Sequence, residues 1–161
     1  MFKEAALQIA IKEIGNGEQG ENNSGPFVQK YLLGLVEPPA NWCAAFVCWC
    51  YYQAMGAPIY LLPPFPYTLS ARKLMNELNK SDNIRIYVNK INPKRGDLIF
   101  FWRESPTSWM GHVGIIEYAG PKWIGTIEGN KGKFPSKVAR YKYPADTLKI
   151  PKFLAFGHID L

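Results

Sequence analysis

Every cysteine of this chain lies in the stretch N-W-C-A-A-F-V-C-W-C, residues 41–50. Residues 42–55 contain no helix breaker, whereas Pro38-Pro39 precede the stretch and Gly56 and Pro58 follow it. These neighbours predict where the helix begins and ends. Because the segment is apolar on almost every side, we expect it to be buried at the centre of the fold.

The three cysteines could form a metal site, a disulfide, or one reactive thiol with two bystanders. Their C-x4-C and C-x-C spacings lack the C-x2-C pairs typical of zinc sites. On a helix, Cys43 and Cys50 share a face but lie about two turns, ~10 Å, apart, which is too far for a disulfide. We therefore interpret Cys48 and Cys50 as small apolar core residues.

Cys43 differs because it lies at the predicted start of the helix. Unpaired backbone N–H groups and the helix dipole stabilise a thiolate there and lower the thiol pKa. The same N–H groups can hold an oxyanion when a thiolate attacks a carbonyl. Cys43 is thus a candidate nucleophile that still requires a base.

The chain has two histidines. His158 falls in a terminal β-rich segment, which indicates a structural or surface residue. His112 lies between Gly111 and Gly114, where neighbouring groups can approach closely. The strand that follows ends in Glu128 and Asn130, either of which could orient the imidazole, so His112 is the candidate base.

The pairing of segments 112–118 and 123–128 decides which side chains share a face. A three-residue loop would pair His112 with Glu128, and a five-residue loop would pair it with Asn130. Both loops place all three on one face, whereas a four-residue loop would turn Glu128 away. The sequence leaves the loop length open.

Helical patterns precede strand patterns along the chain. Helices are predicted at 2–14, 26–33 and 42–55, and a fourth helix, capped by Thr68 or Ser70, is predicted to run to about residue 78. Strands are predicted at 84–88, 98–102, 112–118, 123–128, 138–143 and 153–159. Such an order is typical of an α+β domain with helices on one side of an antiparallel sheet. No linker or repeat divides the chain, so residues 1–161 are predicted to form a single domain.

The composition excludes several classes of protein. With 47% hydrophobic and 20% charged residues among 161, the chain can bury one core and is not disordered. A net charge of +6 favours an anionic partner such as wall polymer, nucleic acid or acidic lipid. Basic residues do not alternate with a stacking platform, so nucleic-acid binding is not favoured. No apolar run has the ~18 residues that cross a membrane.

Four motifs occur in the order NWCAAFVCWC (41–50), KRGDLIFFW (94–102), GHVGIIE (111–117) and TIEGN (126–130). Together with NNSGPFVQKYL (22–32), they resemble the CHAP (cysteine, histidine-dependent amidohydrolase/peptidase) domains of the NlpC/P60 group. The resemblance covers roughly residues 1–135. It implies a papain-like α+β fold, with a nucleophile at a helix start and a base on the sheet.

The resemblance also implies roles for individual residues. Cys43 would be the nucleophile, His112 the base, Glu128 the orienting residue and Asn130 a further polar partner. The side chain of Asn41 could assist the backbone N–H of Cys43 in holding the oxyanion.

Some relatives bind calcium through an acidic loop before the cysteine. Here that region offers Glu18, Glu21, Asn22 and Asn23, a weak set of ligands for calcium. We therefore expect no metal and no cofactor.

An aromatic substrate groove is predicted from Trp42, Trp102 and Trp109, which adjoin Cys43 or the approach to His112. Residues 103–110 are expected to form a loop over the cleft. The Pro-rich segment 58–66 is either its opposite wall or a simple connection.

The resemblance implies a thiol hydrolase that cuts an amide of peptidoglycan through a thioester. It could be an N-acetylmuramoyl-L-alanine amidase or an endopeptidase of the stem peptide or cross-bridge. A cysteine acyltransferase or deamidase acting on another amide is an alternative, as is a non-catalytic basic module that binds wall polymer or nucleic acid.

The N-terminal segment reads as an amphipathic helix rather than a signal peptide. Because peptidoglycan lies outside the cytoplasmic membrane, we expect export by another route, either as a phage lysin through a holin pore or as a secreted antibacterial effector. An effector would have an immunity protein or inhibitor as partner. We expect a monomer that neither binds nucleic acid nor inserts into membranes.

Overall fold

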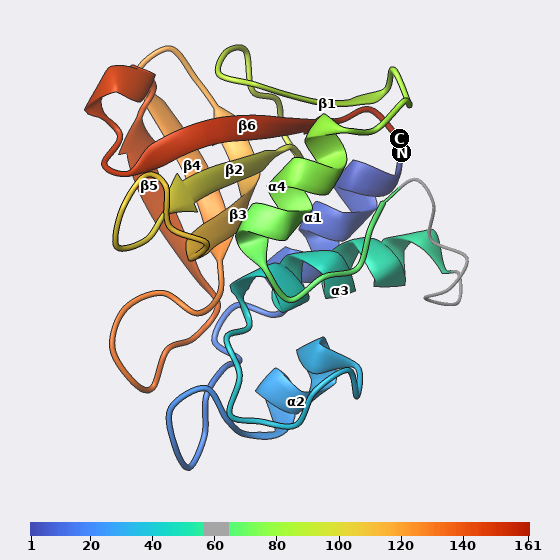
Figure 1. The fold of residues 1–161 in the computed structure, drawn as a ribbon, viewed down its shortest axis with the longest axis vertical. Coiled ribbons are helices and arrows are strands. Elements are labelled where there is room, and N and C mark those ends of the chain that lie inside the picture. The colour runs from blue at the N-terminus through green and yellow to red at the C-terminus, as the bar shows by residue number, and fades with distance from the viewer. Residues whose placement is uncertain (57–64) are drawn as a thin grey trace.

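The computed structural model describes residues 1–56 and 65–161 and has the predicted α+β architecture, with helices preceding an antiparallel sheet (Figure 1). The helices are α1 (Phe2–Lys12), α2 (Pro26–Leu32), α3 (Cys43–Met55) and α4 (Ala71–Asn79). The strands are β1 (Ile86–Asn89), β2 (Leu98–Trp102), β3 (Gly111–Ala119), β4 (Trp123–Glu128), β5 (Ala139–Pro144) and β6 (Phe153–Ile159). A 3-10 helix, Thr147–Lys149, precedes β6.

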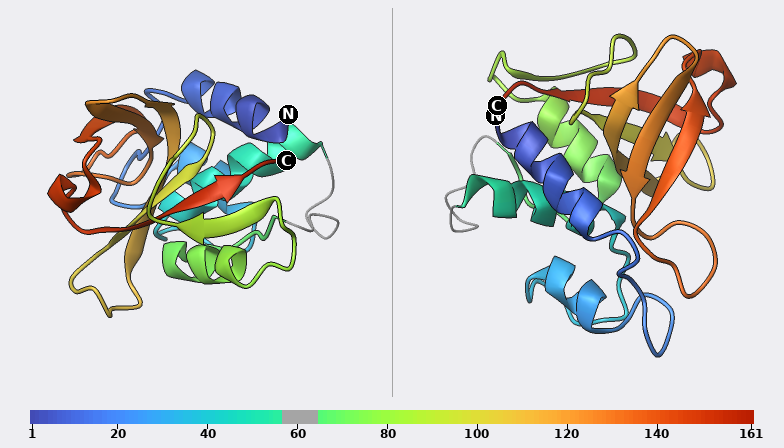
Figure 2. Two further views of the ribbon diagram at one scale, coloured as in Figure 1. Left: turned by 90° about the horizontal axis from the view of Figure 1, so that it is seen from above. Right: turned by 180° about the vertical axis from the view of Figure 1, so that it is seen from behind.

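The strands form a sheet of order β1-β6-β2-β3-β4-β5 in which every neighbouring pair is antiparallel. Helices α1, α3 and α4 lie on one side of this sheet, and all three contact β3 (Figures 1 and 2). Helix α2 packs against α3 further from the sheet (Figure 1). Strand β3 therefore lies where the helices and the sheet meet.

Helix α3 is buried as its apolar sequence predicts. Its residues from Cys43 to Tyr51 are all buried in the core between the sheet and the other helices. The helix begins after Trp42 and ends at Gly56, whose φ of 62° is left-handed, a conformation that favours glycine. The predicted start of the helix, on which the assignment of Cys43 depends, is confirmed.

The pairing of β3 with β4 shows which of the three loop lengths left open by the sequence is present. Ala119 pairs with Ile124 across a loop of even length, which on its own would turn Glu128 away from His112. A bulge between Ile116 and Tyr118 adds one residue to β3, and beyond it Ile115 pairs with Ile127. The bulge thus returns Glu128 to the face of His112, as a simple even loop would not.

The two chain ends are joined to the sheet by a buried polar cluster. Nζ of Lys3 lies 3.1 Å from Oδ1 of Asp97 and 2.9 Å from Oδ1 of Asp160. Nδ1 of His158 lies 3.0 Å from Oδ2 of Asp97, and its Nε2 lies 2.7 Å from Oδ1 of Asn89. His158 is therefore a buried structural residue, which excludes the surface position that the sequence left open.

The structure bears on the predicted lack of a membrane span but not on the Pro-rich segment. In the part of the chain that the structure describes, no helix is both long and apolar enough to span a membrane. Residues 57–64 of the Pro-rich segment lie outside the described residues, so its place beside the cleft stays a prediction.

Replacing the buried carboxylate of the cluster tests its contribution to stability. Asp97→Asn should lower the free energy of unfolding by about 3 kcal/mol, because it leaves the buried ammonium of Lys3 without its inner partner. Urea denaturation followed by circular dichroism measures this change. Glu4→Gln, which breaks the exposed pair with Arg95, should cost about 1 kcal/mol or less. Equal losses in the two variants would contradict the structural role of Asp97.

Candidate active site

Cys43 is the first residue of α3, and its side chain is almost fully covered, with 3% of the residue exposed. Burial alone would raise the pKa of its thiol, but a hydrogen bond and positive charge from His112 oppose burial. The charge of Arg103 and the backbone N–H of Val113 act in the same direction, and the net effect lowers the pKa of Cys43. The thiol is thus set to ionise beside His112.

His112 projects from β3 and is 4% exposed. Its Nε2 lies 2.7 Å from Oε2 of Glu128. Burial acts to lower the pKa of His112, whereas its contacts with Cys43 and Glu128 raise it, and the net shift is upward. A carboxylate on Nε2 thus favours the imidazolium that would pair with a thiolate.

The close approach of Glu128 to β3 depends on Gly114. A Cβ atom on Gly114 would lie 2.5 Å from Cγ of Glu128, so the buried Glu128 side chain would have to move. The glycine beside the histidine therefore leaves space for the carboxylate that holds the ring.

Glu128 is fully buried, and hydrogen-bond donors and a cation stabilise its negative charge. Its Oε1 accepts hydrogen bonds from the hydroxyls of Thr126 at 2.5 Å and Tyr143 at 2.8 Å. Nζ of Lys131 lies 3.4 Å from Oε2. Burial would raise the pKa of Glu128, but the contacts with His112, Lys131 and Thr126 lower it to about 2. The carboxylate is therefore ionised at neutral pH and fixes the imidazole.

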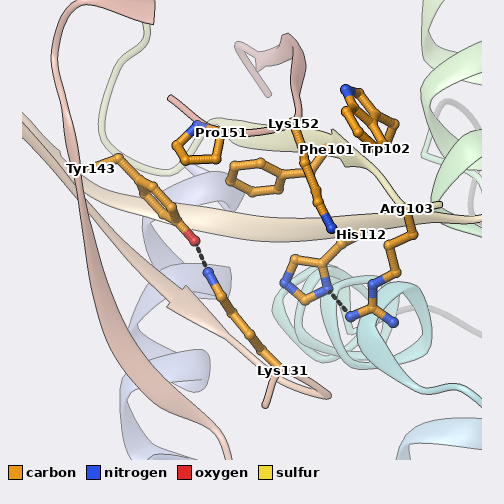
Figure 3. A pocket seen from close by; sticks show the side chains of 8 residues that line it. All are labelled: Phe101, Trp102, Arg103, His112, Lys131, Tyr143, Pro151 and Lys152. Carbon is orange, nitrogen blue, oxygen red and sulfur yellow. Dashed lines mark hydrogen bonds between the residues drawn. The ribbon is translucent and has the colours of Figure 1, made fainter. Parts of the chain in front are cut away.

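Arg103 is a residue of the site that sequence reasoning missed. It follows β2, and its Nη2 lies 2.9 Å from Nδ1 of His112 (Figure 3). The same Nη2 donates to the backbone oxygen of Asn130 at 2.7 Å. A guanidinium only donates hydrogen bonds, so Nδ1 acts as the acceptor in this contact. Thr126, Tyr143 and Lys131 were missed as well. Alternation along β4 places Thr126 on the face of Glu128, whereas nothing in the sequence signals the other contacts.

The structure separates Asn130 from the imidazole that it was expected to contact. Its Nδ2 lies 3.4 Å from Oδ1 of Asn41, and only its backbone oxygen reaches the site, through Arg103. Oδ1 of Asn41 also accepts from Nδ2 of Asn23 at 3.5 Å. Asn41 lies beside Cys43 in one cavity, where its Nδ2 is a suitable donor to an oxyanion.

The three tryptophans have different positions. Trp109 is 75% exposed and lines a cavity with Cys43, and Trp102 lines a second cavity with His112. Trp42 instead has no exposed surface and stacks on Tyr31 at 5.6 Å between ring centroids. The prediction that Trp42 binds substrate is therefore wrong, because it is a core residue at the base of α3.

Cys48 and Cys50 lie in the core away from the site. All three cysteines are free thiols. Burial raises the pKa of Cys48 to about 12 and raises the pKa of Cys50 well above its ordinary range. Neither thiol is therefore ionised near neutral pH, whereas the pKa of Cys43 is shifted in the opposite direction.

The acidic loop before Cys43 has a structural role for Glu18. One carboxylate oxygen accepts from Nε1 of Trp42 at 3.2 Å and from the backbone N–H of Asn23 at 3.1 Å. The other accepts from the backbone N–H of Ser136 at 2.8 Å. Because three N–H groups point at this carboxylate, its surroundings do not suit a cation. Among the described residues, no group of three or more His, Cys, Asp or Glu side chains could hold a metal ion.

Comparison with known proteins identifies the family of the chain. The profile of the CHAP domain matches residues 36–130, and the chain belongs to this family. A search of curated proteins finds no match.

Two solved structures share the fold. "The crystal structure of Ly7917" has a TM-score of 0.60 at 17% sequence identity, over 98% of this chain and 62% of the other. "The crystal structure of Ly7917 with the hydrolyzing product of MDP" has a TM-score of 0.60 at 16% identity, with the same coverage. The chain thus spans less than two thirds of the Ly7917 chain.

Selective alkylation tests the difference between the thiols. Iodoacetamide near neutral pH should label Cys43 and spare Cys48 and Cys50, because only the pKa of Cys43 is lowered. Peptide mass spectrometry of the folded protein locates the label. The Cys43→Ala protein, as the control, should remain unlabelled on the same timescale. Faster labelling of Cys48 or Cys50 would overturn the assignment.

Substitutions of the base and its partner should have graded effects on turnover. His112→Ala should lower kcat by about 10²–10⁴-fold, the usual contribution of a general base. Glu128→Gln should lower it less and shift the basic limb of the pH–rate profile to lower pH, because it removes a carboxylate that raises the pKa of His112. Asn130→Ala should have the smallest effect, since its side chain contacts Asn41. An inactive, folded His158→Ala beside an active His112→Ala would refute these roles.

Proposed function

We propose that this protein is a cysteine amidase or peptidase that hydrolyses an amide bond of peptidoglycan. The observation that supports this proposal most directly is the buried series Cys43, His112 and Glu128, in which the thiol pKa is lowered and the histidine pKa is raised. Membership of the CHAP domain family and the fold shared with Ly7917, solved with a hydrolysis product of MDP, support the choice of substrate.

In the proposed reaction the thiolate of Cys43 attacks the amide carbonyl and forms a tetrahedral intermediate. The backbone N–H of Cys43, at the start of α3, and Nδ2 of Asn41 donate to its oxyanion. His112 passes a proton to the amine, which leaves as a thioester forms. His112 then takes a proton from water, which attacks the thioester to release the acid and restore the thiol.

Glu128 remains ionised throughout this cycle. Its low pKa keeps it an acceptor, so it holds Nε2–H of His112 and offsets the charge of the imidazolium. The aromatic side chains of Trp102 and Trp109 line the two cavities that meet at Arg103 and would contact the substrate.

We propose that the activity requires no calcium, because the Glu18 carboxylate is already bound by N–H donors. We also propose a monomer that acts on the wall outside the cytoplasmic membrane, as a phage lysin or as a delivered effector with its own inhibitor. The free thiols agree with a reducing environment before delivery.

Digestion of purified peptidoglycan tests the proposed function. The wild-type protein should release fragments with a new amine and a new carboxyl group, and mass spectrometry identifies the bond. The reaction should continue in excess EDTA, and Cys43→Ala should release nothing while keeping its circular dichroism spectrum. A folded, alkylation-competent protein that leaves peptidoglycan intact would refute the wall substrate and favour another amide, as for an acyltransferase or deamidase.

Targeted expression tests the site of action. In a Gram-negative host the wild-type protein should be tolerated in the cytoplasm and should lyse the cells when fused to a periplasmic export signal. Cys43→Ala should be harmless in both places, because it lacks the nucleophile. A harmless exported wild type that is folded and soluble would argue against a wall hydrolase.

A further inference from the structure

A cavity of about 270 Å³ lies beside His112, and Cys43 is not among its lining residues (Figure 3). We call it the His112 cavity. Phe101, Trp102 and Tyr143 give it an apolar wall, and Arg103, Lys131 and Lys152 supply three positive charges. Its volume is near the lower end of the ~300–1,000 Å³ typical of small-molecule pockets. The cavity is thus suited to a single residue of a larger substrate.

Two of the three cations lack a carboxylate partner among residues 1–56 and 65–161. Lys131 is paired with Glu128 at 3.4 Å. Arg103 instead donates to two neutral acceptors, Nδ1 of His112 and the backbone oxygen of Asn130. Nζ of Lys152 lies 5.4 Å from the ring centroid of Trp102. Arg103 and Lys152 therefore retain donors for an anion.

The backbone of Lys152, which lines the cavity, has an uncommon conformation. Lys152 has a φ of 61°, a left-handed conformation that a lysine rarely adopts. The carbonyl that accepts from Arg103 belongs to Asn130, whose φ of 57° is left-handed as well. Figure 3 shows the side chains of Arg103 and Lys152 both directed toward the imidazole of His112.

The chemistry of the proposed reaction assigns a side of the substrate to this cavity. Cys43 bonds to the carbonyl carbon, so the acyl part lies in the cavity that Cys43 lines with Asn41 and Trp109. The departing nitrogen takes its proton from His112, so the amine part lies on the side of His112. The His112 cavity is lined by His112 and not by Cys43, and it is therefore the side of the leaving amine.

We propose that the His112 cavity recognises a free carboxylate on the residue that leaves as the amine, with Arg103 as the main ligand and Lys152 as a second. This inference rests on the proposed function and names its substrate class: an amide whose amine-side residue carries an anion. The carboxylate could be the C-terminal group of that residue, or the free α-carboxylate of a glutamate that continues through its γ-carboxyl. Either would lie within the reach of one residue from the scissile nitrogen.

Two matched pairs of synthetic muramyl-peptide amides test the proposal and separate these sources. All four share one acyl part. In the first pair the leaving residue is a C-terminal alanine with a carboxylate or a carboxamide. In the second it is a γ-linked glutamate with its α-carboxylate free or amidated. Wild-type kcat/KM should be about 10- to 100-fold higher for the acid than for the amide of at least one pair.

Variants assign this preference to the two cations. Arg103→Gln should lower kcat/KM for all four substrates, because the charge of Arg103 also lowers the pKa of Cys43, and it should reduce the acid-to-amide ratio to near one. Lys152→Gln should reduce the ratio about two- to fivefold, as for an exposed charge. Lys142→Gln is the matched control, because Lys142 also lies over a tryptophan, 4.6 Å from the Trp123 centroid, but does not line the cavity. Its ratio should be that of the wild type.

A binding measurement keeps this test independent of turnover. Cys43→Ala should bind the free amine product with a carboxylate more tightly than its carboxamide, and adding Arg103→Gln should abolish the difference in calorimetry. If no peptidoglycan or synthetic amide is cleaved but this difference remains, the proposed function fails and the anion subsite stands. Equal wild-type rates for acid and amide in both pairs, or a preference that survives Arg103→Gln, would overturn the subsite.

Discussion

The hydrogen bond between Nε2 of His112 and Oε2 of Glu128 joins two strands inside the core, and the arrangement of the site depends on it. A buried carboxylate is costly unless charges and donors satisfy it. Besides His112, the hydroxyls of Thr126 and Tyr143 donate hydrogen bonds to this carboxylate, and the ammonium of Lys131 supplies a positive charge. Three adjacent strands, β3, β4 and β5, thus contribute to the position of one imidazole ring.

The position of the His112–Glu128 pair also determines why the nucleophile lies at the start of α3. Strand β3 contacts α3, so His112 faces the first residue of that helix. The start of α3 is fixed in turn by Trp42, the residue before Cys43. The indole N–H of Trp42 donates to Glu18. Its ring packs so closely against Gly129 that a Cβ atom on Gly129 would lie 2.4 Å from the ring. Cys43 is therefore positioned by the residue before it, and the interpretation of Trp42 as a substrate contact fails for this reason.

The sequence predicts those parts of the site that depend on local patterns. Helix α3 and strands β2, β4 and β6 follow from apolar runs between breakers, and the assignment of Cys43 to a helix start needed only those breakers. The common face of His112 and Glu128 was predicted from a loop of odd length, but the structure reaches it through an even loop and a bulge near Glu117. A bulge depends on how a strand pairs with its neighbours in the sheet, and no residue pattern in β3 predicts this one.

Within the candidate active site, contacts between segments far apart in the sequence were the hardest to predict. Asn130 was expected at the imidazole because it follows Glu128 by two residues, but its left-handed φ of 57° ends the alternation of faces and turns the side chain to Asn41. Residues 103–110 were expected as a loop over the cleft, but the contact of Arg103 with His112 was not, since a loop residue after β2 has no periodicity that directs its side chain. It reaches the site only because β2 pairs with β3 and Trp102 lies opposite Gly111.

The contact with Arg103 and the reaction with Cys43 require different protonation states of Nδ1 of His112. An Nδ1 atom that accepts from the guanidinium carries no proton, which corresponds to the neutral tautomer of His112 with its hydrogen on Nε2. The thiolate–imidazolium pair instead needs a proton on Nδ1, directed at Cys43. The positive charge of Arg103 nevertheless lowers the pKa of Cys43, so removing the charge would weaken the thiolate. A carboxylate in the His112 cavity would reconcile the two requirements, because it draws the guanidinium from Nδ1 while keeping its charge within the site.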